Sequence, residues 1–331
     1  FKLCDGKCPM LDDNGLCEIH KNLGEDYLGV VCKQFPRYSE YYGTIKESGI
    51  GLACEEAARI ILSENRPFSM ETAACDEEYE PSSEYDSSFA LQIFAAREAV
   101  FKILAKESLS IHEKLIVILD MGSKIQQCIN TDEYDNIKSV VNDYLKEGIA
   151  YTLDETRNLS DSGQFEDISL QQGIRQILYP YEEMEVLNPE WEVILKDIID
   201  SLFEQMSDEE YNILNEEFGT YMVSRAYEYR QLLEYLVFRY FAKSIYDYDF
   251  LGKCQMLVTN FFVIRQMDII RWLDNHREYS FKDRMDVVHI FSRQVEYSED
   301  NIENLYEDFI FDDIFKTDSL IAILWIDSEN I

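Results

Sequence analysis

The sequence predicts a mainly helical protein that begins with an irregular, cysteine-rich metal-binding module. Three observations carry this prediction. The 142 residues from 190 to 331 contain no proline, which favours long helices. Apolar residues recur at helical spacing through much of the chain after residue 86. Five of the eight cysteines fall within the first 54 residues, so the two ends of the chain differ in kind.

The N-terminal module is predicted to span residues 1–62. Seven of the 13 glycines lie in the first 51 residues, and no helical period persists there. So short and irregular a segment has little core of its own, and a bound metal would supply the missing folding energy. Within it, Tyr38–Ile45 suggests a short hairpin. The stretch Cys54–Leu62 predicts a helix, because acidic residues follow directly in its first turn.

Residues 63–85 are predicted to be a linker, since they combine two prolines with a run of serines and acids. The remainder, residues 86–331, is predicted to be an all-α helical domain packed against the module. Residues 256–270 are apolar on nearly all sides of a helix, which is typical of a helix at the centre of a core.

Helix starts are marked by capping signals. Ser110 with Glu113, and Ser207 with Glu210, have the spacing of capping boxes. Asn188 followed by proline is typical of a cap and a first helical residue.

The charge of the chain limits its partners. There are 65 Asp and Glu against 30 Lys and Arg, a net charge of −35. Such a surface repels phosphate backbones, so we expect no nucleic-acid partner. It either attracts a basic, lysine-bearing partner or only maintains solubility. The longest uncharged apolar run, Cys254–Ile264, has 11 residues and is too short to span a membrane. With no signal peptide visible, the sequence predicts a cytoplasmic protein that does not bind membranes.

Four cysteines in the first module are candidate metal ligands: Cys8, Cys17, Cys32 and Cys54, at intervals of 9, 15 and 22 residues. Thiolates are soft ligands, and four of them complete either a zinc site or an iron–sulfur cluster. Disulfides are the less favoured alternative, because clustered cysteines in a long chain without a secretion signal indicate metal. Of the remaining cysteines, Cys4 is a possible fifth thiol, whereas Cys75, Cys128 and Cys254 are expected to be ordinary packing residues.

Several short stretches resemble the flagellin lysine-N-methylase family and its cysteine-cluster module, which belongs to a wider group of zinc- or iron-chelating proteins. The N-terminal stretches are Cys8-Pro-Met-Leu11, Gly15-Leu-Cys17, Leu23-Gly-Glu25, Cys32 with Phe35-Pro-Arg37, and Cys54-Glu-Glu-Ala-Ala-Arg59. The C-terminal stretches are Glu234-Tyr-Leu-Val-Phe-Arg239 and Phe291-Ser-Arg-Gln-Val-Glu-Tyr-Ser298 with Asn301. Together they cover most of the chain in the family's order.

The sequence also departs from the family pattern. Members usually carry further cysteines upstream, so we expect the N-terminal part of the pattern, and with it some metal ligands, to be missing from this stretch. Tyr297 stands where a histidine is common, which puts a titrating role for that side chain in doubt.

The resemblance implies methyl transfer from S-adenosylmethionine to lysine side chains of flagellin. It also implies a site at Cys8, Cys17, Cys32 and Cys54 that holds an iron–sulfur cluster, with [4Fe–4S] favoured, or else zinc. A desolvated channel of aromatic and acidic side chains could orient and deprotonate the lysine.

Two arginines in family-like stretches, Arg37 and Arg293, are candidates for binding the donor or the substrate. If they do, they should face a common cavity that also borders Cys32 or Cys54, where they would hold the donor carboxylate. For Arg293 the favoured alternative is a structural ion pair with Glu296, three residues along the same helix. Arg37 could equally pair with the acidic surface.

Two other functions stay open on the sequence. The chain could be a non-catalytic binding protein that zinc staples, or an electron-transfer or radical protein that uses an iron–sulfur cluster. No catalytic residue and no oligomeric state follow from the sequence, and neither a dinucleotide-binding glycine motif nor a hydrolase triad is present.

Overall fold

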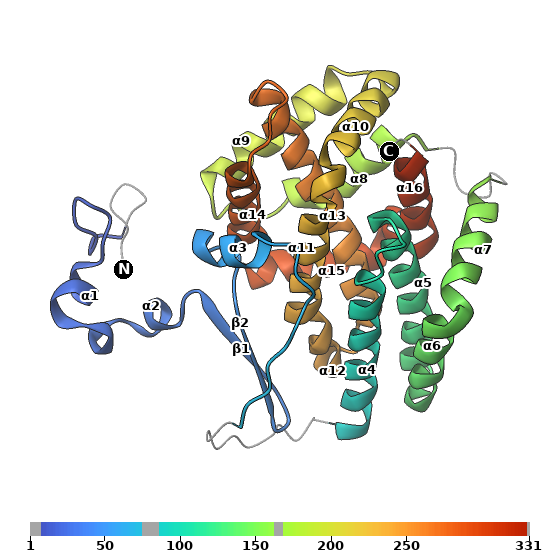
Figure 1. Ribbon diagram of the computed structural model, residues 1–331, viewed down its shortest axis with the longest axis horizontal. Helices are drawn as coiled ribbons and strands as arrows, with labels where there is room; N and C mark the ends of the chain where they lie inside the picture. The colour runs from blue at the N-terminus through green and yellow to red at the C-terminus, as the bar shows by residue number, and fades with distance from the viewer. Residues whose placement is uncertain (1–7, 75–85, 162–167, 330–331) are drawn as a thin grey trace.

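The computed structural model describes residues 8–74, 86–161 and 168–329. It is mainly helical, as predicted, and Figure 1 shows one large helical body with a small lobe extending from it. The linker residues 75–85, with Cys75, and the first seven residues, with Cys4, lie outside the described residues.

The N-terminal part holds α1 (Glu18–Leu23), α2 (Val30–Gln34), β1 (Arg37–Tyr42), β2 (Ile45–Ile50) and α3 (Glu55–Leu62). The body holds α4 (Ser87–Leu104), α5 (Ile111–Asn130), α6 (Ile137–Asp143), α7 (Ile149–Asp161), α8 (Leu170–Glu182), α9 (Pro189–Ile198), α10 (Asp208–Met222), α11 (Ala226–Tyr240), α12 (Ser244–Asp247), α13 (Phe250–Asp274), α14 (Phe281–Val295), α15 (Glu299–Phe311) and α16 (Thr317–Glu329).

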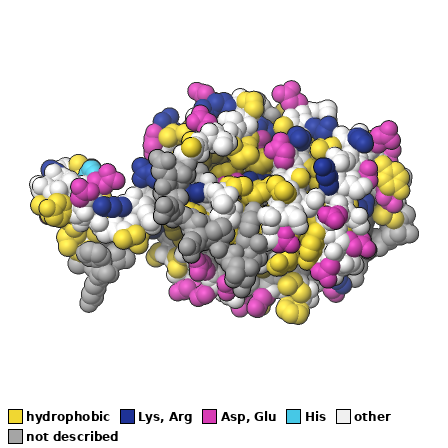
Figure 2. All heavy atoms as spheres, turned by 90° about the horizontal axis from the view of Figure 1, so that it is seen from below, with side chains coloured by type: hydrophobic (Ala, Val, Ile, Leu, Met, Phe, Trp, Pro, Cys, Tyr) yellow, Lys and Arg dark blue, Asp and Glu magenta, His cyan; other side chains and the backbone are white. Residues whose placement is uncertain are grey.

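The lobe, residues 8–36, has little core. Neither α1 nor α2 contains a buried residue. Several apolar side chains stand in solvent instead, with Tyr27 67%, Val30 69% and Val31 79% exposed. In Figure 2 the lobe is a separate protrusion with hydrophobic and acidic side chains on its surface. The described contacts within it are local ones, such as the ion pair between Lys21 and Asp12 at 3.0 Å.

The hairpin β1–β2 joins the lobe to the body. Its antiparallel register runs from the pair Arg37 and Ile50 to the pair Tyr42 and Ile45. The prediction of a hairpin here is confirmed, although its second strand continues five residues past Ile45. Polar contacts fix it to the helices: Glu47 pairs with Arg97 of α4, and Glu40 pairs with Lys243 at 3.0 Å.

Helix α13 lies at the centre of the body. It is buried along almost its whole length and packs against α5, α9, α11 and α14. Both predicted capping boxes are present, at Ser110 with Glu113 and at Ser207 with Glu210, and the side chain of Asn188 caps α9. Residues 190–327 contain no strand, which confirms the prediction of a helical body.

Two buried ionic clusters connect these helices. In the first, Asp327 of α16 contacts His112 of α5 at 2.6 Å and lies 4.0 Å from Arg265 of α13. In the second, Arg284 of α14 pairs with Asp268 of α13 at 2.6 Å and with Glu228 of α11 at 3.0 Å. All of these side chains are at most 7% exposed, so the charges are satisfied by one another rather than by water.

The described part of the predicted linker, residues 63–74, has no regular structure but is docked on the body. Arg230 of α11 donates to the side chain of Asn65 at 2.7 Å and to the carbonyl of Arg66 at 3.0 Å. The ring of Phe68 stacks on Phe101 with centroids 4.1 Å apart. None of the helices within the described ranges is long and apolar enough to cross a membrane.

Candidate functional site

The four predicted ligand cysteines lie in different parts of the N-terminal segment. Cys8, Cys17 and Cys32 belong to the lobe, with Cys32 in α2, whereas Cys54 is the N-cap residue of α3. Figure 1 shows α1 and α2 in the lobe and α3 against the body. Cys8 and Cys32 are exposed, Cys17 and Cys54 are half-buried, and none forms a disulfide. Over the ranges that the structure describes, no group of three or more His, Cys, Asp or Glu side chains could hold a metal ion. Thiolates suit zinc or iron, but among the described residues these four thiols are not grouped into such a site.

Cys54 lies where the N-terminal segment packs onto the body, because it directly precedes α3. Ala57, Ala58 and Leu62 bury one face of α3 against α11 and α14. The exposed opposite side of its first turn carries Glu55 and Glu56. Cys54 therefore sits at an acidic helix start on the boundary between the two parts.

A wide groove of about 940 Å³ opens between the first turn of α3 and the outer face of α14; we call it the α3–α14 groove. Cys54, Glu55 and Phe35 line one side of it, and Arg293 and Tyr297 line the other. The rings of Phe35 and Tyr297 have centroids 6.2 Å apart and give this part of the groove an aromatic wall.

The structure thus places Arg293 and Cys54 in one cavity, while Arg37 lies outside its lining. The Arg37 guanidinium donates to the carbonyl of Lys33 at 3.4 Å instead. Cys32 is also outside the lining, although its neighbour Val31 contributes to it.

A second cavity of about 580 Å³ continues the groove towards α9 and the end of α13. The two share Glu55, His289 and Arg293. The second cavity adds further charged side chains, among them Arg271, Asp286 and Glu190. Together the cavities form one long surface depression with both signs of charge along it.

Behind the groove lies a buried ion pair between Arg239 of α11 and Glu296, the residue that ends α14. The Arg239 Nη1 atom is 3.0 Å from Glu296 Oε2, and the two side chains are 12% and 0% exposed. The same carboxylate oxygen accepts from the hydroxyl groups of Tyr235 at 2.8 Å and Tyr240 at 3.1 Å. Glu296 Oε1 has no hydrogen-bond partner among the described residues.

This ion pair contacts the N-terminal segment directly. The Arg239 guanidinium lies over the ring of Tyr38 in β1 at 4.7 Å and over that of Tyr297 at 5.7 Å. Gly51 lies against the same group, since a Cβ there would be 2.8 Å from the Tyr297 hydroxyl and 3.3 Å from Arg239 Nη1. The pair therefore links α11, α14 and the N-terminal segment.

Burial keeps the phenols of this region protonated. It raises the pKa of Tyr38 and of Tyr297, and it raises the pKa values of Tyr235 and Tyr240 well above the ordinary value for tyrosine. Each hydroxyl can therefore donate a hydrogen bond at any physiological pH.

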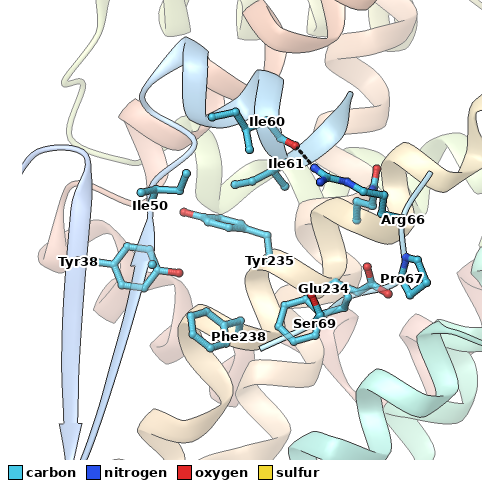
Figure 3. Close-up of a pocket in the computed structure, with 13 residues that line it drawn as sticks. Tyr38, Ile50, Ile60, Ile61, Arg66, Pro67, Ser69, Glu234, Tyr235 and Phe238 are labelled. Atoms are coloured by element: carbon cyan, nitrogen blue, oxygen red, sulfur yellow. Dashed lines mark hydrogen bonds between the residues drawn. The ribbon is translucent and has the colours of Figure 1, made fainter. Parts of the chain in front are cut away.

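A smaller pocket of about 310 Å³ lies between the hairpin, the end of α3 and α11 (Figure 3). Tyr38, Tyr235 and Phe238 line it, and the Glu234 carboxyl reaches it while paired with Arg230 at 2.7 Å. Burial raises the pKa of Glu234. This aromatic pocket shares no lining residue with the groove, so we treat it as a separate cavity.

Comparison with known proteins assigns this chain to a family. Residues 97–323 match the family model described as the FliB lysine N-methylase C-terminal domain. The chain belongs to this family. The resemblance inferred from the sequence is thereby confirmed.

Three curated relatives match a shorter stretch of 59 residues, or 18% of this chain, at 37% identity. They are the flagellar biosynthetic protein FliU of Salmonella muenchen and the lysine-N-methylases of Salmonella typhimurium and Salmonella choleraesuis. The match spans 35% of the FliU protein and 15% of each lysine-N-methylase. No solved structure matches this chain.

The FliB-type region contains one wall of the groove, with His289 and Arg293, and both members of the buried ion pair. The opposite wall, with Cys54, comes from the segment before it.

The ion pair of Arg239 with Glu296 is not predicted from the sequence. The spacing suggests a pair of Glu296 with Arg293. Glu296 instead follows directly after α14, and its buried carboxylate pairs with Arg239. The available signal was that both residues stand in the two family-like C-terminal stretches, 57 residues apart.

Proposed function

We propose that this chain transfers methyl groups from S-adenosylmethionine to lysine side chains of flagellin, and that the α3–α14 groove is the reaction site. The observation that carries the proposal is that the lysine N-methylase family match contains a wall of this groove. That a FliU protein described as flagellar is among the relatives supports flagellin as the substrate. The net charge of −35 suits a lysine-bearing protein partner, mainly by speeding its association.

The groove is suited to a donor and a lysine side chain together. Its volume of about 940 Å³ is at the upper end of what small-molecule sites have. S-adenosylmethionine supplies an electrophilic methyl group on a positively charged sulfur. The aromatic wall of Phe35 and Tyr297 suits such a cation and the aliphatic part of a lysine. Arg293 would hold the donor's carboxylate.

The lysine must be neutral when its nitrogen attacks the methyl carbon. Its ammonium form must therefore first give up a proton. The new C–N bond then forms as the carbon–sulfur bond breaks, which leaves a methylammonium group and neutral S-adenosylhomocysteine. Glu55 lines the groove, and no cation lies within ion-pair distance of its carboxylate in the described structure, so it is the candidate for attracting the lysine and accepting that proton. Holding both reactants in one groove supplies proximity, which is the largest contribution that a binding surface can make to this reaction.

The test is incubation of the protein with flagellin and methyl-labelled S-adenosylmethionine, followed by mass mapping. We expect a gain of one or more methyl groups on lysines. Arg293→Met should lose most of the transfer, whereas Arg157→Met, on an arginine far from the groove in α7, should keep it. Circular dichroism checks that both variants fold. Absence of transfer by a folded wild-type protein, or full transfer by Arg293→Met, would contradict the proposal.

We further propose that Cys8, Cys17, Cys32 and Cys54 hold an iron–sulfur cluster or zinc, with [4Fe–4S] favoured by the family resemblance. Support comes from the soft-ligand chemistry of four thiols in one short segment and from the coreless lobe, which bound metal would stabilise. Anaerobic purification followed by visible absorption and metal analysis tests this. A brown protein contains a cluster, and a colourless protein with bound zinc contains the other metal.

The same measurements separate the other two functions. A brown protein without methyl transfer would be an electron-transfer or radical protein, and a zinc protein without methyl transfer would be a binding protein. Metal-free protein with ordered residues 8–36 would refute the metal proposal.

A further inference from the structure

The far end of the groove contains two arginines that form no ion pair with a described carboxylate. Ten of the 14 arginines of this chain lie within 4.0 Å of a carboxylate. Among the described residues, Arg271 and Arg293 have no such partner, yet both line the 580 Å³ cavity. Arg271 interacts with the Asp283 carboxylate only at longer range. In a chain with more than twice as many acids as bases, two arginines in one cavity without a close carboxylate indicate that another anion binds there.

Carboxylates line the same cavity without pairing with these arginines. Asp286 and Glu190 both border it, as does Glu55 on the side shared with the first cavity, and none of the three takes part in an ion pair with a described residue. Opposite charges are therefore held apart inside one depression. A phosphate or another purely anionic ligand would be repelled by these three carboxylates. A zwitterion, with a carboxylate and an ammonium group on one carbon, would satisfy both kinds of side chain.

The helix geometry supports a single binding surface. Asp286, His289 and Arg293 are three and then four residues apart along α14, so they share one face of that helix. Arg271 lies in the last turn of α13, and Glu190 lies in the first turn of α9. His289 lines both cavities, and its buried Nδ1 atom has no hydrogen-bond partner in the described structure.

We propose that this end of the groove binds the α-amino-acid end of the methyl donor. Arg271 and Arg293 bind the carboxylate, and Asp286 and Glu190 attract the ammonium group. The inference rests on the proposed function, because it uses S-adenosylmethionine as the donor. It places the sulfur-bound methyl group further along the groove, on the side of Cys54, Phe35 and Tyr297, where the lysine would enter.

The experiment measures binding rather than turnover. Calorimetric titration compares S-adenosylhomocysteine with 5′-methylthioadenosine, which has the same nucleoside and sulfur but lacks the amino-acid end. Each of Arg271→Met and Arg293→Met removes a charged hydrogen bond to the ligand's carboxylate. Each variant should therefore bind S-adenosylhomocysteine with an affinity lower by about tenfold or more. Both variants should bind 5′-methylthioadenosine as the wild type does, to within about twofold.

Arg157→Met is the matched control, because Arg157 also has no ion pair with a described carboxylate but lies over the ring of Trp325, away from the cavity. It should bind both ligands normally. If the wild type binds S-adenosylhomocysteine and both groove variants bind it equally well, this inference and the carboxylate-binding role of Arg293 are wrong, whereas methyl transfer to flagellin is still decided by the transfer assay with the wild-type protein. If a groove variant lost affinity equally for both ligands, the substitution would have distorted the groove in general, and this inference would also be refuted. If the wild type binds neither ligand, the donor assignment itself fails.

Discussion

Replacing Arg239 with methionine should destabilise the protein by about 3–5 kcal/mol, the usual cost of removing one partner of a buried ion pair. The structure gives the reasons for a value in this range. The substitution leaves the Glu296 carboxylate, which is 0% exposed, with phenol donors but no cation. It also removes the guanidinium that lies over the rings of Tyr38 and Tyr297, although methionine keeps part of that apolar contact.

The measurement is urea unfolding followed by far-ultraviolet circular dichroism. Arg59→Met is the matched control, because Arg59 also pairs with a glutamate, Glu56 at 2.6 Å, but with side chains 51% and 62% exposed. Water and salt screen an exposed pair, so this control should unfold close to the wild type. Pairing Arg239→Met with Glu296→Gln then completes a double-mutant cycle, and the double variant should lose less than the sum of the two single variants. A loss below about 1 kcal/mol for Arg239→Met, with an unchanged denaturant slope, would refute the role given to this ion pair.

Three further predictions concern the body and the hairpin. Burial opposes ionisation of Asp327, but its arginine and histidine partners outweigh burial and lower its pKa to about 2. Because the folded pKa is below the ordinary value of 3.8, Asp327 should contribute about 2 kcal/mol above pH 4 that is lost as the pH falls towards 2. The stability difference between wild type and Asp327→Asn should shrink over that range, and a constant difference would contradict the assignment. Arg284→Met should cost about 3–5 kcal/mol in urea unfolding, because it leaves Asp268 buried without its cation; a cost below about 1 kcal/mol would show that this cluster does not hold α13 and α14 together. Gly49→Ala should cost about 1 kcal/mol, since the new Cβ would lie 2.5 Å from the Tyr38 hydroxyl, which must move into the neighbouring pocket. An unchanged unfolding midpoint would mean that this ring is not held in place.

The helical body was predictable because its signals are local. Capping boxes at Ser110 and Ser207 need only residues three positions apart, and the structure forms both. Residues 256–270 are apolar on nearly all sides of a helix, and this pattern likewise predicts the central helix α13. Such patterns depend on the helix period alone, so one sequence suffices to find them.

The site was only partly predictable, because it depends on contacts between distant residues. Family-like stretches pointed to Cys54 and Arg293 as candidates, and the structure places both in the lining of one groove. They also suggested Arg37, which the structure leaves outside, because the chain turns into β1 there and its guanidinium bonds back to Lys33. Nothing in a single sequence shows which of several arginines will lack a carboxylate, so Arg271 was missed.

Some local signals gave incomplete answers. Residues 63–74 have the composition of a linker, yet Phe68 and its neighbours pack onto the body. Composition reports the absence of regular structure and not whether a segment is docked. In the same way, cysteine spacing predicts a kind of ligand chemistry, whereas bringing four thiols together depends on a lobe that has almost no core to fix its fold.

Photolabelling tests the central claim, that the α3–α14 groove binds the methyl donor, most directly. Irradiation of the protein with methyl-labelled S-adenosylmethionine, then proteolysis and mass spectrometry, locates the label. We predict labelling in peptides that contain Cys54 or the segment from His289 to Tyr297, and its loss when excess S-adenosylhomocysteine is present. Competed label confined to other peptides, such as those that line the aromatic pocket around Phe238, would contradict the claim.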